Sequence, residues 1–396
     1  MSKAVAQRHR LVGAVWLVLV GGALAVAEGG PATASAACPA GQVMAGGTCV
    51  SLDEAKARID EIVRQAMAKR DLKAVLAGFS VDDQPPSLFA WGSSMTGVPA
   101  TPDMHFRNGA VAIAYIGTVL LQSHDKGARS VDDKLSKWFP GYPKADQVTL
   151  TMLINGTSGY ADYVTDDSFL KQFYADPFRH WTPDELITIG LGRQMICDPG
   201  TCWSYAHTNF VILGKVLEKA TGRPLADFIR EGILDPLALK DTRSELTAII
   251  QEPVLHAYDA ERGRYEESTY WNPSWTLAHG AIMTSNIADI LKSAAAIGEG
   301  TLVSPASHRL QLAPLTAKFK PWSDTSYYGF GVFRINDWIV QNPSFAGYAA
   351  TMTYLPSRKL ALAVSVTLGE KAPLEGNLST DLLKEIAAYL APDAPF

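Results

Sequence analysis

The distribution of strand and helix patterns along the chain most constrains its fold. An amphipathic helix pattern at 51–69 precedes two strand-like runs, at 72–81 and 87–94. A second group of strand-like runs occupies 327–368 and is followed by a terminal helix pattern. Because the strands lie at both chain ends, they predict an α+β fold: one antiparallel sheet built from both ends and flanked by helices, with an all-helical lobe at roughly 110–300 inserted between them.

The first helix, the last helix and one helix in the middle of the chain have clear sequence signals. Ser51 and Glu54 form a capping-box pattern at the start of the first helix, and Thr182, before a proline and three residues from Glu185, predicts another helix start. The residues expected to share one inward face of each helix repeat at helical spacing. They are Ala55, Ile59, Ile62, Val63 and Ala66 in the first helix, and Leu382, Leu383, Ile386, Ala387 and Leu390 in the last.

The N-terminal residues resemble a secretory signal. A basic region at Arg8 and Arg10 precedes an apolar run at 11–26 and the small-residue stretch "PATASAAC", which offers A-x-A cleavage sites. The apolar run has 16 residues, fewer than the roughly 20 that a spanning helix needs, although an uncleaved anchor is the main rival interpretation. We therefore expect a signal peptide at 1–37 and a secreted, periplasmic or cell-envelope protein with no transmembrane span after cleavage.

Four cysteines fall into two near pairs, each closing a loop that contains glycine and proline. In an oxidising compartment these pairs predict the disulfides Cys38–Cys49 and Cys197–Cys202, the first closing a short N-terminal loop at 38–50. A lipidated Cys38 is the alternative, but Ser35 stands where a lipobox requires an aliphatic residue. No further ligands at zinc-like spacing accompany the cysteines, so no metal is predicted.

Charge and common motifs exclude several functions. The net charge of −5 is spread without long like-charge runs, so no nucleic-acid partner is expected. The sequence has no G-x-S-x-G elbow, no H-E-x-x-H helix, no Walker loop and no G-x-G-x-x-G after a strand, and no cofactor is predicted. The literal S-x-x-K at 123–126 ends an apolar helix before a glycine, and we treat it as chance.

Several segments, taken in order, resemble the serine hydrolase superfamily of class C β-lactamases, DD-peptidases and β-lactamase-like esterases. The likeness covers a domain at 51–396. Its motif-bearing segments are 100–110, 127–141, 148–163, 199–225, 277–290, 328–332 and 341–356. The resemblance implies the fold of that superfamily and a mechanism in which a helical S-x-x-K serine attacks an acyl carbon, assisted by the lysine and a tyrosine.

The residues at the family's motif positions depart from the pattern. In "FRNGAVAI" the nucleophile position falls on Ala110 and the lysine position on Ile113, and neither side chain attacks or accepts a proton. In the second motif Tyr205 is retained, Ala206 takes the serine position and His207 replaces the asparagine. Tyr205 and His207 are therefore the candidate catalytic residues.

The third motif is also altered. Gln341, Asn342 and Pro343 occupy its positions, and Pro343 lacks the N–H that a docking strand offers. The downstream glycine remains as Gly347. The residues expected to line the binding cleft are Asn155, Ser158, Tyr205, His207, Gln341, Asn342 and Gly347.

Two functions of different class follow. The first is an exported, non-catalytic member of the family that binds a small-molecule or peptide ligand, such as one derived from the cell wall. The second is an active hydrolase, such as an esterase, DD-carboxypeptidase or β-lactamase, with a relocated nucleophile. A Ser158–His207 dyad is one form of the second hypothesis. The loss of both Ser and Lys favours the first.

Overall fold

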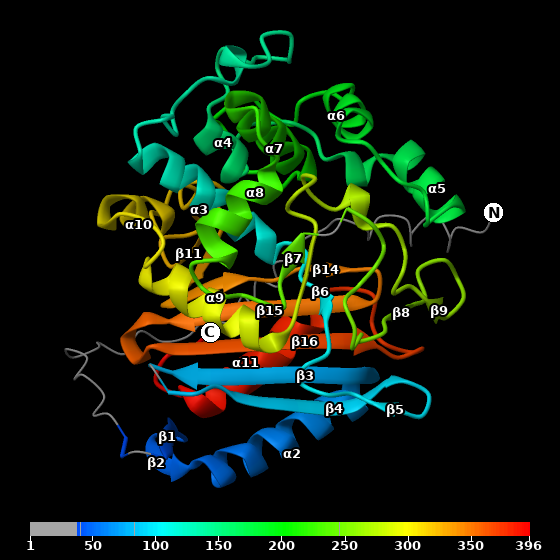
Figure 1. The fold of residues 1–396 in the computed structure, drawn as a ribbon, viewed down its shortest axis with the longest axis vertical. Helices are drawn as coiled ribbons and strands as arrows, with labels where there is room; N and C mark the ends of the chain where they lie inside the picture. The colour runs from blue at the N-terminus through cyan, green and yellow to red at the C-terminus, as the bar shows by residue number, and fades with distance from the viewer. Residues whose placement is uncertain (1–37, 40, 83, 245) are drawn as a thin grey trace.

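A nine-stranded antiparallel sheet spans one half of the molecule in the computed structural model, which describes residues 38, 39, 41–82, 84–244 and 246–396 (Figure 1). The predicted signal peptide lies outside the described residues. In spatial order the strands are β11 (Ser326–Tyr328), β12 (Phe333–Ile335), β13 (Trp338–Gln341), β15 (Tyr348–Leu355), β16 (Leu360–Leu368), β3 (Leu72–Val81), β4 (Ser87–Met95) and β5 (Val98–Pro99), with β14 (Ser344–Phe345) paired to β15.

The two chain ends meet at the centre of this sheet. Strand β16 pairs antiparallel with β3 in a register that places Val364 opposite Ala77, and β3 pairs in turn with β4 across the predicted hairpin. The predicted assembly of the sheet from both ends of the chain is therefore confirmed.

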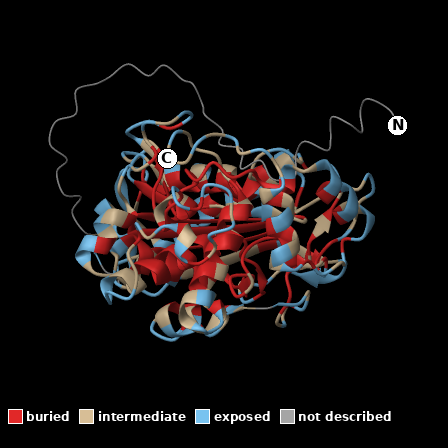
Figure 2. Ribbon diagram, turned by 90° about the horizontal axis from the view of Figure 1, so that it is seen from above, coloured by how far each residue is buried: buried red, intermediate tan, exposed pale blue. Residues whose placement is uncertain are grey.

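The sheet buries both faces, and its strands alternate between two cores. In β16, Leu362 and Val364 belong to one apolar cluster, while Ala361 and Ala363 belong to the other. This alternation follows from the two-residue period of a strand. Figure 2 shows the buried residues concentrated in the centre of the molecule.

Two helices cover the outer face of the sheet. Helix α2 (Leu52–Arg70) contacts β3, and α11 (Leu378–Leu390) contacts both β15 and β16. Their buried residues include all those predicted from helical spacing, and the capping box of Ser51 and Glu54 is formed. Beside α2 lies the ribbon of β1 (Gln42–Ala45) and β2 (Thr48–Ser51), which the Cys38–Cys49 disulfide closes.

The helical lobe packs on the opposite face, where α9 contacts β3, β15 and β16. Figure 1 shows it above the sheet. Its helices are α3 (Val111–Asp125), α4 (Leu150–Ile154), α5 (Asp167–Ala175), α6 (Pro183–Leu191), α7 (His207–Thr221), α8 (Leu225–Ile229), α9 (Ile287–Glu299) and α10 (Pro305–Gln311). Shorter turns are η1 (Leu135–Lys137), η2 (Tyr163–Thr165), η3 (Arg230–Leu234) and η4 (Pro273–Trp275), and η5 (Pro356–Arg358) joins β15 to β16.

This lobe is not all-helical, which corrects the sequence prediction. It includes a small sheet of β6 (Phe106–Arg107), β10 (Met283–Ser285) and β7 (Arg243–Ser244), and a ribbon of β8 (Tyr258–Asp259) and β9 (Glu266–Glu267). These strands have two or three residues each, too few to produce a periodic pattern in the sequence.

The predicted strand at 327–335 is also corrected, because the structure divides it into β11 and β12. A turn at Gly329 to Gly331 separates them, with the N–H of Gly329 donating to the carbonyl of Val332 at 2.8 Å. Gly331 has a φ of +81°, a conformation that side-chain-bearing residues rarely adopt.

Both predicted disulfides are present, with Cα–Cα distances of 5.6 Å for Cys38–Cys49 and 6.2 Å for Cys197–Cys202. Within the part of the chain that the structure describes, no helix combines the length and apolar character needed to cross a membrane.

Candidate functional site

A pocket of about 120 Å³ lies between the start of α3, the start of α7, the β8–β9 segment and the turn between β14 and β15. Four predicted cleft residues line it, namely Tyr205, His207, Asn342 and Gly347, together with Ala110. The pocket therefore occupies the place where the altered motifs converge.

The α3 helix presents no reactive side chain at its start. Ala110 is the N-cap residue, lines the pocket and makes no side-chain capping hydrogen bond. Ile113, one turn later, has 0% exposure and packs in the core rather than lining the pocket. The pocket lining thus has the Ala110 methyl group where the family resemblance places a hydroxyl, and position 113 has no amine.

Strand β14 and the preceding Pro343 pack closely against the start of α3. Gly109 has a φ of +44°, and a Cβ atom there would lie 2.5 Å from the Cβ of Pro343 and 2.8 Å from Cε1 of Phe345. Such distances exclude any side chain without movement of the neighbours. Gly109 therefore permits the close contact between the α3 start and the β14 strand.

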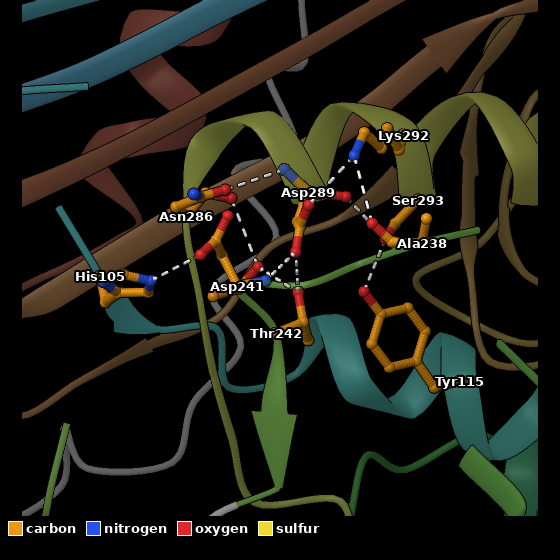
Figure 3. Close-up of polar contacts among 10 residues, drawn as sticks. His105, Tyr115, Ala238, Asp241, Thr242, Asn286, Asp289, Lys292 and Ser293 are labelled. Carbon is orange, nitrogen blue, oxygen red and sulfur yellow. Dashed lines mark hydrogen bonds and ion pairs between the residues drawn. The ribbon is translucent and has the colours of Figure 1, made fainter. Parts of the chain in front are cut away.

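A buried polar network holds α3 against α9 (Figure 3). The hydroxyl of Tyr115 on α3 lies 2.7 Å from Oγ of Ser293 on α9, and Ser293 in turn donates to the carbonyl of Asp289 at 2.9 Å. The Asp289 carboxylate accepts hydrogen bonds from the backbone N–H of Asp241 and the hydroxyl of Thr242. Burial raises the pKa of Tyr115, so this phenol stays neutral and serves the structure.

The two candidate catalytic residues differ in their surroundings. Burial raises the pKa of Tyr205 well above its ordinary value, so the phenol is a poor proton acceptor at neutral pH. His207 has two contacts with Asp162: its Nδ1 lies 3.0 Å from Oδ2, and its backbone N–H donates to Oδ1 at 3.1 Å. In the tautomer that donates from Nδ1 to this carboxylate, Nε2 carries no proton, and His207 also lines the pocket.

Asp162 is a site residue that the sequence analysis did not select. Its side chain is only 6% exposed. It lies in the "TSGYADY" segment, at the aspartate position of the matching family segment, so a signal was available. The sequence did not indicate that Asp162 contacts His207, because the two residues are 45 positions apart in the chain.

Two expected cleft residues, Asn155 and Ser158, are buried and do not line the pocket, which corrects their assignment. Asn155 accepts hydrogen bonds from the backbone N–H and hydroxyl of Thr157, at 3.1 and 2.7 Å. Ser158 is fully buried and donates to Oδ1 of Asn209 at 2.6 Å. Because Asn209 accepts the Ser158 proton and Asp162 faces Nδ1 of His207, the structure does not form a Ser158–His207 dyad.

Gln341 is likewise placed in the interior, with its amide Nε2 donating to the carbonyl of Gly331 at 2.8 Å. Asn342 does line the pocket, and its Nδ2 donates to Oγ1 of Thr380. The carbonyl of Pro343 accepts hydrogen bonds from Asn377 Nδ2 at 2.8 Å and the N–H of Ala350 at 3.0 Å. Proline has no N–H to donate to a docking peptide, and the carbonyl of Pro343 already accepts two hydrogen bonds.

Gly347 brings the turn before β15 into contact with β8. Its φ is +78°, and a Cβ atom there would lie only 2.2 Å from the carbonyl oxygen of Tyr258. The backbone of Gly347 also hydrogen-bonds to the carboxyl of Asp259, the residue after Tyr258. Only glycine allows both the conformation and the approach.

Two acidic residues that the sequence analysis missed, Asp259 and Glu261, also line the pocket. The backbone N–H of Glu261 donates to Oδ1 of Asp259 at 2.6 Å, and the hydroxyl of Tyr174 donates to Oε2 of Glu261 at 2.9 Å. Burial raises the pKa of both carboxyls, and the charge of Asp259 raises that of Glu261 further. No sequence motif marks them, because their chemistry arises from burial in the folded protein.

Aromatic rings form another wall of the pocket. Phe173 and Trp275 pack with ring centroids 5.0 Å apart, and Trp275 meets Phe345 at 6.2 Å and His207 at 6.3 Å. The pocket thus combines an apolar wall with a few polar groups, the composition typical of small-molecule sites. Among the described residues, no cluster of three or more His, Cys, Asp or Glu side chains is arranged to hold a metal ion.

Comparisons with known proteins place these observations in a family context. A model of the family described as "Beta-lactamase" matches residues 59–383. The chain is 27% identical over 279 residues to penicillin-binding protein 4* of Bacillus subtilis (63% of this chain, 57% of that protein), and 25% identical over 327 residues to penicillin-binding protein 4 of Amycolatopsis lactamdurans (75% and 81%). Among solved structures, a D-stereospecific amidohydrolase from a Streptomyces species is similar in fold, with a TM-score of 0.74 at 23% identity, covering 85% of this chain and 98% of that one.

Proposed function

This chain belongs to the beta-lactamase family, and we propose that it is an exported ligand-binding member that does not use the family's serine acylation chemistry. The observation that carries the proposal is the start of α3, where Ala110 lines the pocket and the buried Ile113 follows one turn later. These are the positions at which the family resemblance requires a serine and a lysine.

Acyl transfer needs a nucleophile and a group that takes its proton. Removing the nucleophile alone lowers turnover by roughly 10⁶-fold in a well-studied serine hydrolase, leaving only the contribution of binding and oxyanion stabilisation. Here the hydroxyl and the amine are both missing, and burial keeps the remaining Tyr205 phenol neutral. These changes argue jointly against an acyl-enzyme at Ala110.

The pocket itself remains suited to binding. It is lined by Trp275, Phe345, His207 and Asn342, among others, and Ile113 does not fill it. The signal-like N-terminal sequence and the two disulfides support a location outside the cytoplasm, where cell-wall peptides and small molecules are available ligands.

The proposal is tested by incubating the purified protein with a fluorophosphonate probe and, separately, with a fluorescent penicillin, and measuring the intact mass. We expect no covalent adduct with either probe. A thermal shift measured in parallel with the same penicillin reports non-covalent binding. Stoichiometric labelling of any serine would refute the proposal.

A second candidate is hydrolysis by a catalyst other than the family serine, and the His207–Asp162 contact favours it. With Nδ1 directed at Asp162, Nε2 of His207 is available to take a proton from a water molecule that attacks an ester carbonyl. The products would be the acid and the alcohol, with no covalent intermediate.

The two candidates are separated with p-nitrophenyl acetate as substrate. Turnover by the wild-type protein that disappears in His207→Gln would establish the second candidate. Turnover that is absent, or equal in the two proteins, would leave binding as the function. Asp198→Asn is the control for effects of a substitution outside the pocket, because that carboxylate is 71% exposed and does not line the pocket.

A further inference from the structure

We propose that the ligand of this pocket carries a protonated amine, which the carboxylates of Asp259 and Glu261 bind beside the aromatic wall. The inference rests on the proposed function, because it names the ligand class of the same pocket. It is based on the position of the two carboxyls, on their missing counter-charge and on the rings that adjoin them.

The two carboxyls are placed inside the pocket rather than on the protein surface. Asp259 is 2% exposed and Glu261 is half-buried, yet both line the pocket. Hydrogen bonds from the backbone of Glu261 and Gly347 orient Asp259, and the Tyr174 hydroxyl orients Glu261. The pair is therefore preorganised by groups that come from α5, the β8–β9 segment and the turn before β15.

Within the part of the chain that the structure describes, no cation balances the pair. Among the described residues, neither Asp259 nor Glu261 forms an ion pair, and the two arginines of the same segment, Arg262 and Arg264, both pair with Glu266 instead. The other ionisable groups that act on the pair are Tyr174 from α5 and Glu266 from β9, and neither brings a positive charge. His207 lines the same pocket, but its Nδ1 contacts Asp162 rather than this pair. Buried carboxylates without a counter-ion are costly, so such a pair favours a cationic ligand group.

The neighbouring rings provide a second, independent feature that suits an ammonium group. Phe173, Trp275 and Phe345 line the same pocket and contact one another through their rings. The face of an aromatic ring attracts a cation, and the attraction grows when water is excluded. A ligand with an ammonium group attached to an apolar or aromatic body would satisfy both the carboxylates and this wall.

Binding of an ammonium group predicts proton release. At neutral pH the pair retains a proton because burial and mutual repulsion raise the pKa of the carboxyls. An ammonium ion between them favours the ionised forms, so the retained proton leaves as the ligand binds. A neutral ligand of the same shape would release none.

The experiment is isothermal titration calorimetry with three probes of similar shape: 2-phenylethylammonium, neutral 2-phenylethanol and anionic 3-phenylpropionate. The titrations are run at pH 7 in two buffers with different ionisation enthalpies, so that released protons are counted. The proteins are the wild type, the double variant Asp259→Asn/Glu261→Gln and the control Asp324→Asn, which removes one exposed carboxylate outside the pocket.

We expect 2-phenylethylammonium to bind at least about tenfold more tightly than 2-phenylethanol, with release of up to one proton, in the wild type and in Asp324→Asn. The double variant should lose both the preference and the proton release. The wild-type probe series is informative even if the double variant does not fold.

Equal affinities for the three probes, tighter binding of 3-phenylpropionate, or no binding of 2-phenylethylammonium at millimolar concentration would overturn this inference. The first two outcomes would leave the proposed binding function intact. Covalent labelling by the fluorophosphonate probe would instead refute the proposed function, whatever the preference among the amine probes, so the two failures are distinguishable.

Discussion

The imidazole Nδ1 of His207 lies 3.0 Å from Oδ2 of Asp162, and the backbone N–H of the same histidine donates to Oδ1 at 3.1 Å. One carboxylate therefore holds both the first residue of α7 and its ring. Asp162 also accepts a hydrogen bond from the N–H of Val164 in η2. This joins the start of α7 to the η2 turn and sets the direction in which the His207 ring meets the pocket.

Asp162→Asn should destabilise the protein by about 1–3 kcal/mol, because a buried, charge-assisted hydrogen bond is replaced by an amide that must also accommodate Nδ1. Urea denaturation at pH 7 measures the loss. The control is Asp198→Asn, whose exposed ion pair with Lys144 should contribute about 0–1 kcal/mol. Equal stability of the two variants would contradict a structural role for the Asp162 contact.

Restoring the two missing motif residues should not restore acylation. In Ala110→Ser/Ile113→Lys we expect no stoichiometric penicillin adduct by intact mass, because position 207 is a histidine and Pro343 offers no N–H. The buried lysine should also cost at least about 2 kcal/mol of stability, since Ile113 has 0% exposure. Ala110→Ser alone is the control without the buried charge. Strong acylation of the double variant would mean that the rest of the site is intact.

Gly347→Ala should destabilise the protein by roughly 2 kcal/mol or more and displace Asp259, because the new Cβ would lie 2.2 Å from the carbonyl oxygen of Tyr258. Gly97→Ala is the matched control: its φ of +77° is similar, but nothing lies within 4 Å of the added Cβ. The difference between their unfolding free energies isolates the clash from the backbone strain. Similar unfolding free energies for the two variants would show that the turn at Gly347 moves away from Tyr258 without loss of stability.

The acidic pair should make stability fall as the pH rises. Burial raises the pKa of Asp259 and Glu261 in the folded protein above their ordinary values of 3.8 and 4.5. Below those values both states are protonated and the pair carries no penalty. Above them the folded state holds more protons than the unfolded state, so the free energy of unfolding decreases until the raised pKa values are passed.

This pH effect is measured by urea denaturation at several pH values from about 4 to 8. Asp259→Asn/Glu261→Gln should lack the contribution, so its stability relative to the wild type should improve steadily across that range. The asparagine at 259 keeps an acceptor for the N–H of Glu261. Parallel stability curves for the two proteins would contradict the predicted burial penalty.

The helices and the central sheet were predictable because their signals are local and periodic. The inward faces of α2 and α11 follow the 3.6-residue repeat, and the alternation of Leu362 and Ala363 between two cores follows the two-residue repeat of a strand. The small strands of the lobe and the break at Gly329 to Gly331 carry no such repeat. The pairing of β10 with β6 and β7 also joins segments that are distant in the chain.

The sequence by itself determined which groups are missing from the pocket: Ala110 and Ile113 have no hydroxyl or amine in any conformation. Through the family resemblance it also predicted Tyr205 and His207 as candidate catalytic residues. Only the tertiary structure decided which groups are present and how they behave. In the folded protein Asp162 contacts His207, and Asp259 is buried beside Glu261 at the pocket. Burial shields these side chains from water. Proton affinity and charge recognition depend on that environment rather than on residue type alone.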